Sequence, residues 1–376
     1  MNSYNVNETI ININENDIFL NDNIYYINDT LKGYLHSIKS EIDKNIDLWE
    51  KNKKYLNPYE FINTNYDEMN SCICSYKPIS RAFFKMIEIL YNFNFGFQKN
   101  IKSFHLAEGP GGFIEALSYF RKNKNDLYYG ITLIDENSNS NSVPKWSKAD
   151  YFLSKNPNII IENGADNTGN LYNKENLLYM SKYKNSIDFI TADGGFDFSI
   201  DFNKQEENSL KLIFCEVCFA LMLQKKGGSF VLKVFDLYTS ASIQIIYLLN
   251  YLYEDVIITK PLSSRPANSE KYIICMKFKM VHNLNNILNN FIENYDNYKI
   301  SNILNINVPL SNIFLEKLNE INSIFGQCQI ENIVNILNYM MDNNKSEKME
   351  YNKKAHINKC IKWCKKYNLP LYDHYN

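Results

Sequence analysis

The chain has 376 residues, of which 45% are apolar and 14% aromatic, and its formal net charge at pH 7 is −2. This length exceeds one average domain, so we expect a large domain with extensions, or two domains, around a substantial core. The near-neutral charge excludes a polycationic nucleic-acid binder, and any contact with RNA must use a local basic patch.

The N-terminal residues 1–10 lack the basic and apolar stretches of a signal peptide, and no apolar run in the sequence is long enough to span a bilayer. We therefore expect a soluble, intracellular protein without membrane contact. Two of the eight cysteines, Cys215 and Cys218, fall inside a helical pattern over residues 210–224. The others lack zinc-site spacing, so no metal is expected.

Residues 1–56 are predicted to form an arm and a helix. Residues 1–29 are polar and rich in asparagine, whereas apolar residues recur at helical spacing over 31–54 and predict one amphipathic helix. A second helix is predicted over 80–90, with Ser80 as its N-cap.

Strand-like and helical patterns then alternate as far as residue 278. The predicted strands are 103–107, 127–133, 158–161, 187–192, 229–234, 255–260 and 271–278. This alternation predicts an α/β fold with a doubly wound sheet, whose ligands lie beyond the carboxyl ends of the strands. After residue 280 the chain becomes asparagine-rich and helical, including 330–341 and 351–366. The lysines of 351–366 indicate either a solvated helix face or a surface for RNA or a partner.

A glycine turn, Glu108 to Phe113, follows the first of these strands and opens a helix. Glycine lets the backbone approach a ligand, and the helix directs N–H groups at it. The turn does not match the dinucleotide pattern GxGxxG. Its G-P-G-G form is more typical of a loop under the amino-acid tail of S-adenosylmethionine, although a tight connection without a ligand is the alternative.

Four charged residues, Lys85, Asp193, Lys233 and Glu270, occur at predicted element ends around this turn. Lys233 lies in the apolar strand 230–235, where an unpaired charge is costly. Two lysines and two carboxylates brought together can hold and deprotonate a weakly acidic hydroxyl, such as that of a ribose. The hydroxyl needs such a base before its oxygen can attack a methyl group. Lysine can act as that base only if burial or a second ammonium lowers its pKa, whereas carboxylates raise it and hold the side chain in place.

We predict Lys233 as the general base, Lys85 and Glu270 as groups that tune and orient it, and Asp193 as the organiser of the lysine and the methyl donor. Taken singly, Lys85 and Glu270 are also consistent with ordinary solvated charges, and Asp193 with a turn cap.

Five segments resemble the FtsJ-like (RrmJ-type) ribose 2′-O-methyltransferase family, whose Lys-Asp-Lys-Glu tetrad the four charged residues match. The segments are 80–85, 109–113, 192–196, 227–233 and 264–270. The resemblance implies a Rossmann-like class I S-adenosylmethionine-dependent methyltransferase fold, with a mostly parallel seven-stranded sheet, helices on both faces and helical extensions. The implied division is an arm and helix over 1–56, a methyltransferase domain over 57–280 and a C-terminal extension over 281–376.

The resemblance also implies site residues. Those expected to contact S-adenosylmethionine are Ser80, Ala107, Glu108, Gly109, Pro110, Gly111, Gly112, Phe113 and Asp193. Either Asp166 or Asn170 makes the adenine-side contact, because Asn170 stands where the family usually carries Asp. Arg265 and Asn268 are expected to hold the RNA.

Within the family, the sequence is more similar to the cap-specific mRNA enzymes of eukaryotes and large DNA viruses than to the bacterial rRNA enzyme. Segments 57–60, 130–133, 236–239 and 264–270 carry this similarity. It implies methylation of the ribose 2′-hydroxyl of the first transcribed nucleotide of capped mRNA. The implied partners are capped mRNA and, through the C-terminal extension, other capping or transcription proteins. The implied location is the cytoplasm, a virion or viral factory for a virus, or the nucleus.

Two alternatives remain open: an rRNA or tRNA ribose methyltransferase of the same fold, and a catalytically silent RNA-binding subunit. An aromatic or acidic pocket for 7-methylguanine would favour the cap-specific enzyme. Trp49, Tyr59 and Trp146 are the aromatic candidates for it.

Overall fold

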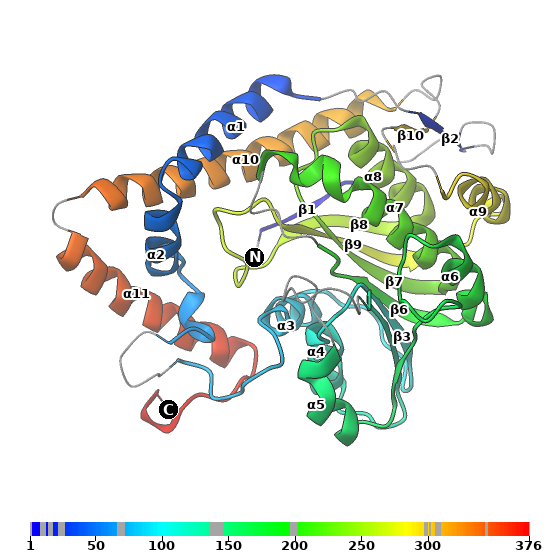
Figure 1. Ribbon diagram of the computed structural model, residues 1–376, viewed down its shortest axis with the longest axis horizontal. Coiled ribbons are helices and arrows are strands. Elements are labelled where there is room, and N and C mark those ends of the chain that lie inside the picture. Colours follow the sequence, from blue (N-terminus) through cyan, green and yellow to red (C-terminus); the bar gives the residue numbers. More distant parts are fainter. Residues whose placement is uncertain are drawn as a thin grey trace.

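A computed structural model describes residues 2–7, 13, 18–21, 27–65, 72–134, 146–195, 202–296, 300, 302–304, 310–342 and 345–375. Its centre is a twisted sheet with helices on both faces (Figure 1). The strand order across the sheet is β1-β8-β9-β7-β6-β3-β4-β5. These strands are β1 (Asn2–Asn5), β3 (Lys102–Leu106), β4 (Leu127–Ile131), β5 (Ile159–Ile161), β6 (Ile187–Ala192), β7 (Gln224–Val234), β8 (Tyr253–Lys260) and β9 (Lys271–Phe278).

The sheet is mostly parallel, as predicted, but it has eight strands rather than seven. Strands β5, β4, β3, β6 and β7 run parallel, and β9 is antiparallel to both β7 and β8. The additional strand is β1, which pairs antiparallel with β8 and places Asn2 opposite Lys260. The sequence of this segment is consistent with either a weak strand or a loose arm, and in the structure it pairs with the edge of β8.

The helices around the sheet are α1 (Asp29–Asp43), α2 (Ile46–Leu56), α3 (Ala82–Asn92), α4 (Gly112–Arg121), α5 (Asp150–Lys155), α6 (Lys174–Tyr179), α7 (Gln205–Leu223), α8 (Ser240–Leu252), α9 (Leu284–Glu293), α10 (Asn312–Met341) and α11 (Lys345–Lys366). A separate two-stranded sheet joins β2 (Ile18–Asn21) and β10 (Asn302–Leu304). Of the helices in the described part of the chain, none is long and apolar enough to cross a membrane.

Alternation along β7 decides which way its side chains point. Phe230 and Leu232 pack in the core that contains the residues of α7 and α8, whereas Val231 packs in the core that contains those of α3 and α4. Because successive strand residues face opposite sides, Lys233 shares the face of Val231. That face is the one covered by α3, the helix that carries Lys85.

The helices outside the sheet differ from the prediction in their length. The predicted helix over 31–54 is two helices, α1 and α2, with a break between Asp43 and Ile46. Helix α10 has 30 residues, of which only 330–341 were predicted. It packs along α1 and α2 through a shared cluster that includes Leu35, Trp49 and Ile333 (Figure 1).

Candidate active site

The four charged residues of the predicted tetrad lie together at the carboxyl ends of β6 and β7. The Lys85 Nζ atom, from α3, lies 2.7 Å from Glu270 Oε2, just before β9. The Lys233 Nζ atom donates to the backbone oxygen of Asp193 at 2.7 Å and lies 3.3 Å from Asp193 Oδ1. The segment 192–196 is described only as far as Gly195, so Phe196 lies outside the described residues.

The electrostatics of the tetrad differ from the expectation for Lys233. Burial lowers its pKa, but Asp193, Glu270 and Glu216 outweigh burial and leave the pKa raised. Burial likewise favours a higher pKa for Glu270, yet Lys85, Lys233 and Lys260 together hold that pKa well below its ordinary value. The expected lowering of the Lys233 pKa is therefore absent, because Asp193, Glu270 and Glu216 together outweigh burial.

Two residues that the sequence analysis did not single out complete this cluster. The Tyr272 hydroxyl donates to Asp193 Oδ1 at 3.0 Å, and Glu216 Oε1 accepts from the Gly194 backbone N–H at 3.2 Å. Burial and Asp193 raise the pKa of Glu216 to about 8. Glu216 carried a usable signal, since it is a carboxyl inside the apolar helix pattern 210–224.

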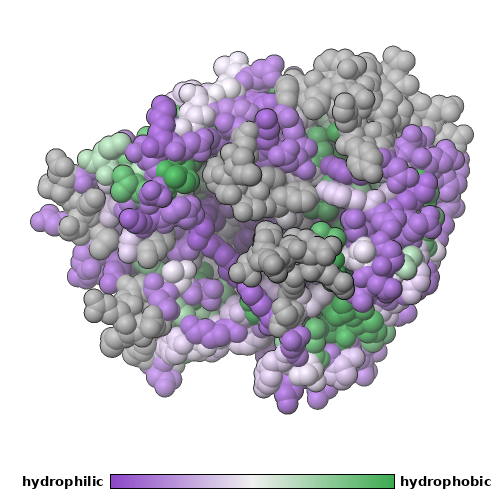
Figure 2. All heavy atoms as spheres, in the orientation of Figure 1, coloured by the Kyte–Doolittle hydropathy of each residue, from purple (hydrophilic) through white to green (hydrophobic). Residues whose placement is uncertain are grey.

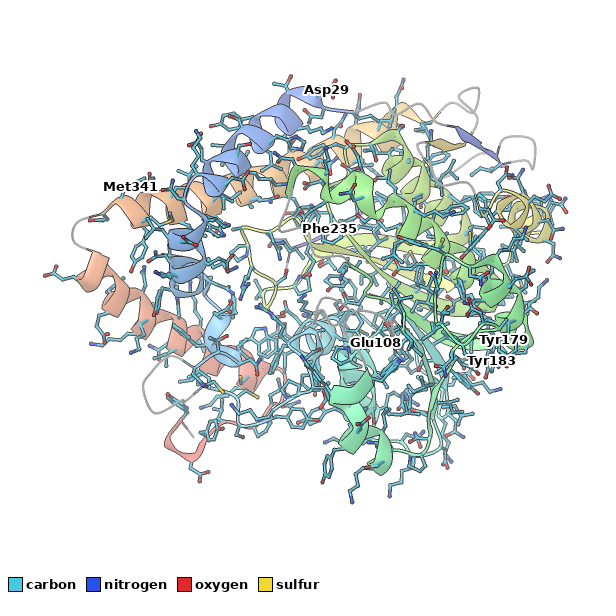
Figure 3. The ribbon with its side chains drawn as sticks, viewed as in Figure 1. Asp29, Glu108, Tyr179, Tyr183, Phe235 and Met341 are labelled. Carbon is cyan, nitrogen blue, oxygen red and sulfur yellow. The ribbon has the colours of Figure 1, made fainter. Side chains whose placement is uncertain are left out.

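The glycine turn opens α4 as predicted, and Glu108 caps that helix (Figure 3). Its Oε1 atom accepts from the backbone N–H groups of Phe113 at 2.5 Å and Ile114 at 3.2 Å. Both Ala107 and Gly111 have left-handed backbone, with φ of 51° and 111°. Burial and the nearby Asp193 raise the pKa of Glu108 well above its ordinary value.

Three buried polar atoms around the turn have no hydrogen-bond partner among the described residues: Ser80 Oγ, Glu108 Oε2 and Trp146 Nε1. Buried polar atoms are normally paired, so this cluster indicates a polar ligand. The turn is also closely packed, because a Cβ on Gly112 would lie 2.2 Å from Ser80 Oγ. Ser80 is not the N-cap of α3, since Arg81 occupies that position.

Asp166 and Asn170, the two candidates for the adenine side, lie in one loop after β5. The Asp166 carboxylate accepts from Thr168 N, Asn173 Nδ2 and Asn176 Nδ2 at 2.7–3.0 Å. Asn170 Oδ1 accepts from the Tyr172 backbone at 2.9 Å, and its amide nitrogen donates to no described residue. Asp166 thus holds the loop in shape, whereas the Asn170 side chain makes one hydrogen bond with a described residue.

The two residues predicted to hold RNA have different surroundings. Arg265 forms a two-point ion pair with buried Glu60, with N···O distances of 2.7 and 3.1 Å. Burial opposes ionisation of Glu60, but Arg265 and Arg81 lower its pKa to about 2. Asn268 is exposed, and its side-chain oxygen accepts from Lys260 at 2.6 Å.

Two cavities of about 250 and 230 Å³ flank the loop that carries these residues, and both are lined by Pro266 and Asn268. Trp49 lines the first and Tyr59 the second, whereas Trp146 lies against the glycine turn, close to Gly111. Among the coloured residues of the face drawn in Figure 2, hydrophilic ones predominate. Only Trp49 and Tyr59 of the aromatic candidates therefore lie beside the loop before Glu270.

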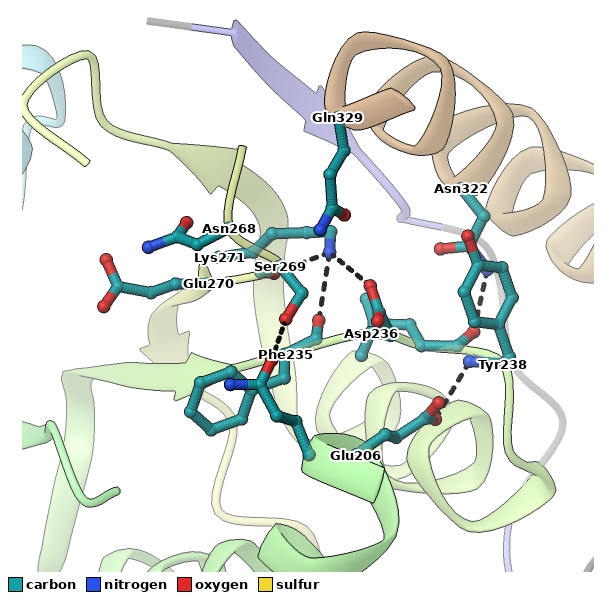
Figure 4. A network of polar contacts seen from close by, with 12 residues as sticks. Glu206, Phe235, Asp236, Tyr238, Asn268, Ser269, Glu270, Lys271, Asn322 and Gln329 are labelled. Carbon is teal, nitrogen blue, oxygen red and sulfur yellow. Dashed lines mark hydrogen bonds and ion pairs between the residues drawn. The ribbon is translucent and has the colours of Figure 1, made fainter. Parts of the chain in front are cut away.

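A buried polar network joins α1 to the end of β7 and the start of β9, next to Lys233 and Glu270. Asp236, three residues beyond Lys233, lies 2.7 Å from Lys39 Nζ of α1 and 3.5 Å from Lys271 Nζ. Figure 4 shows Lys271 between Asp236 and the backbone of Ser269 and Phe235. Burial would raise the pKa of Asp236, but the two lysines lower it to about 2. The ion pair of Lys39 with Asp236 thereby connects α1 to the strand that carries Lys233.

Among the described residues, no group of three or more His, Cys, Asp or Glu side chains could hold a metal ion. Cys215 and Cys218 are buried in the core, where their helical pattern placed them.

The sheet order and the glycine turn that opens α4 are those of the class I methyltransferase fold. The unpartnered atoms around the glycine turn fit a polar ligand such as the S-adenosylmethionine expected for this fold class. More narrowly, the chain belongs to the FtsJ-like methyltransferase family, which matches residues 78–278.

Several relatives of known name are cap-specific enzymes. The chain is 31% identical over 292 residues to cap-specific mRNA (nucleoside-2′-O-)-methyltransferase 2 of Danio rerio, which covers 70% of this chain and 37% of that protein. It is 28% identical over 332 residues to methyltransferase 2 of Mus musculus, covering 81% of this chain and 40% of the relative. It is 33% identical over 185 residues to methyltransferase 1 of Homo sapiens, covering 46% and 21%. The chain thus spans less than half the length of these relatives.

Proposed function

We propose that this chain transfers the methyl group of S-adenosylmethionine to the ribose 2′-oxygen of the first transcribed nucleotide of capped mRNA. The observation that carries the proposal is the pair of ion pairs, Lys233 with Asp193 and Lys85 with Glu270, beside a glycine turn with unpartnered polar atoms. The names of the relatives support the cap as the recognised feature.

In this proposal Lys233 is the general base for the 2′-hydroxyl. Proton removal lets the oxygen form a bond to the methyl carbon as the sulfur–methyl bond breaks, which leaves S-adenosylhomocysteine and a protonated lysine. S-adenosylmethionine supplies a sulfonium, whose positive charge lowers the pKa of a neighbouring ammonium. Asp193 and Tyr272 hold the lysine side of the site, and Lys85 orients Glu270.

The proposed cofactor contacts are the cradle residues and one residue of the loop after β5. Glu108 Oε2 and Ser80 Oγ provide polar atoms without described partners, and Asn170 provides an amide donor. Asp166 supports that loop instead of reaching the adenine, because its carboxylate is already bonded.

The proposed RNA path runs over the loop 264–270, between the cavities lined by Trp49 and Tyr59. Asn268 offers an exposed amide there, whereas Arg265 acts mainly by holding Glu60. We propose residues 57–280 as the methyltransferase domain, with the extensions on either side building the substrate surface and contacting other capping or transcription proteins. The proposed location is intracellular, wherever mRNA is capped, including the nucleus.

The test compares RNAs of one sequence that differ only at the 5′ end, together with a transfer RNA transcript. Each is incubated with methyl-labelled S-adenosylmethionine and digested to locate the labelled ribose. We expect label on the first transcribed nucleotide of the 7-methylguanosine-capped RNA. Equal labelling of uncapped RNA or transfer RNA would overturn the cap assignment, and absence of label on every RNA would favour a silent binding subunit.

A further inference from the structure

Lys260, the last residue of β8, makes an unusual set of contacts with the loop that precedes Glu270. Its Nζ atom lies 2.7 Å from the backbone oxygen of Asn268, 2.6 Å from Asn268 Oδ1 and 2.7 Å from the backbone oxygen of Glu270. A lysine ammonium has three N–H donors, and all three are used here. One charged group therefore clamps two residues of a single loop.

The same loop carries the Glu270 carboxylate to Lys85. Ser264 Oγ donates to Glu270 Oε1 at 2.7 Å, while Glu270 Oε2 faces Lys85 Nζ at 2.7 Å. The side chain of Glu270 is thus fixed at both oxygens, and its backbone is fixed by Lys260. A change at Lys260 would move the carboxylate relative to Lys85 and Lys233.

We propose that Lys260 is a positioning residue of the methyl-transfer site, whose ammonium holds Asn268 and Glu270 in place and whose deprotonation releases them. This inference rests on the proposed function, but the clamp itself is defined by the contacts alone. A neutral amine has one donor fewer and turns a lone pair towards an acceptor oxygen, so the set of three contacts exists only in the charged form.

The surroundings of Lys260 make its charge sensitive to pH. Burial is the largest effect and, with the ammonium groups of Lys271 and Lys85, it lowers the pKa to about 7, against the opposing charges of Glu270 and Asp236. The other titratable groups that line the 230 Å³ cavity with Lys260 belong to Tyr59, Lys271 and Cys328. The clamp is thus present below about pH 7 and is lost as the pH rises through that value.

The direction of the Lys260 pKa shift shows how its charge acts in the folded protein. Folding lowers the pKa of Lys260, so the folded state disfavours its charge and the charge does not stabilise the fold. Replacement by the uncharged Met removes the ammonium together with its three contacts to Asn268 and Glu270, so loop exchange and the pH profile, rather than the thermal midpoint, report the positioning role.

The first experiment is hydrogen exchange of the amides of 262–270 near pH 6.5, about half a unit below the pKa of the clamp. We expect Lys260→Met to accelerate their exchange by about fivefold or more, and Lys260→Arg, which keeps its charge, to leave it slow. Lys279→Met is the matched control, since Lys279 donates to the Asn250 backbone at 3.1 Å outside the site. Exchange in Lys260→Met equal to that of the parent would overturn the clamp.

The second experiment follows single-turnover methyl transfer to capped RNA as a function of pH. In the parent we expect the rate to rise with pH and then to bend towards a smaller slope near pH 7, where Lys260 loses its proton. Lys260→Met should react about 10- to 100-fold more slowly below the bend and show no bend. Lys260→Arg should also show no bend. A bend that persists in either variant would overturn the titration of Lys260 as the cause of the bend.

The two experiments separate the two proposals. A parent without methyl transfer to capped RNA would count against the proposed function, and the exchange experiment would still decide the clamp. A fully active parent with unaltered loop exchange in Lys260→Met would count against Lys260 alone.

Discussion

Lys85 and Glu270 lie 185 residues apart in the sequence and form an ion pair with an Nζ–Oε2 distance of 2.7 Å. Both side chains are about nine-tenths buried, with relative exposures of 11% each. The pair fixes the start of β9 to α3, and it brings the carboxylate that raises the pKa of Lys233 into the site. Four elements that are distant in the chain thus share one charged cluster.

Breaking this pair should damage transfer without preventing cofactor binding. Lys85→Met and Glu270→Gln should each lower the single-turnover rate by about 100-fold, because each removes a preorganised charge beside the reacting groups. S-adenosylhomocysteine affinity, measured by calorimetry, should change by less than about threefold, or 0.7 kcal/mol. A large loss of affinity with a normal rate at saturation would contradict this account.

The two glycines after Asp193 should respond differently to alanine. A Cβ on Gly194 would lie 2.3 Å from Glu216 Oε1 and 2.7 Å from Leu212 Cδ2, so Gly194→Ala should destabilise the fold by about 1–3 kcal/mol. A Cβ on Gly195 would lie 3.0 Å from the flexible end of Lys233, so Gly195→Ala should fold normally and lose activity about 10- to 100-fold.

Thermal unfolding and transfer rates measured side by side check this contrast. Gly33→Ala in α1 is the control, because a Cβ added to Gly33 would have nothing within 4 Å. It should gain about 0.5–1 kcal/mol from helix propensity and keep its activity. Equal behaviour of Gly194→Ala and Gly195→Ala would contradict the placement of Lys233.

Much of this site could be predicted, because its motif residues stand at the ends of strands that the sequence pattern marks. Lys233 is a charge in an apolar strand, and the carboxyl ends of parallel strands meet at one edge of the sheet. The alternation in β7 then directs Lys233 towards α3. The pairing of Lys85 with Glu270 follows from the resemblance rather than from any local pattern, since neither residue has a distinctive neighbourhood.

Other features depend on tertiary contacts that local sequence does not encode. Strand β1 has a weak strand pattern and pairs with the edge of β8, which comes much later in the chain. The raised pKa of Lys233 results from the balance between burial and the acidic side chains of Asp193, Glu270 and Glu216, which only the coordinates reveal. Lys260 lies at the end of an ordinary strand, and only its distances to Asn268 and Glu270 distinguish it.

Glu206 should make stability depend on pH in a specific window. Burial raises its pKa from 4.5 to about 7, so between these values the unfolded chain loses a proton that the folded chain keeps. Stability should therefore fall as the pH rises across the window. Glu206→Gln keeps an oxygen that can accept from Tyr238 and Thr239, and it should gain about 1–3 kcal/mol above pH 7 and little below pH 4.5. Urea unfolding at several pH values measures this, and an unchanged pH dependence would refute it.

Breaking the ion pair between Lys39 of α1 and Asp236 should lower the stability of the fold. Lys39→Met leaves Asp236 with Lys271 at 3.5 Å as its cationic partner in the described network, and we expect a loss of about 3 kcal/mol in unfolding free energy. Adding Asp236→Asn should recover part of that loss, because the uncompensated charge is removed. Lys44→Met, in an exposed pair with Glu41, should change stability by less than about 0.5 kcal/mol. Additive losses in the double variant would contradict a direct interaction.

The most direct test of the central claim is the single-turnover rate of methyl transfer to capped RNA by Lys233→Met, measured at saturating S-adenosylmethionine. If Lys233 takes the proton of the ribose hydroxyl, the rate should fall by about 1,000-fold or more, while S-adenosylhomocysteine binding stays close to that of the parent. A variant that transfers methyl groups at nearly the parental rate would contradict the assignment of this cluster as the catalytic site.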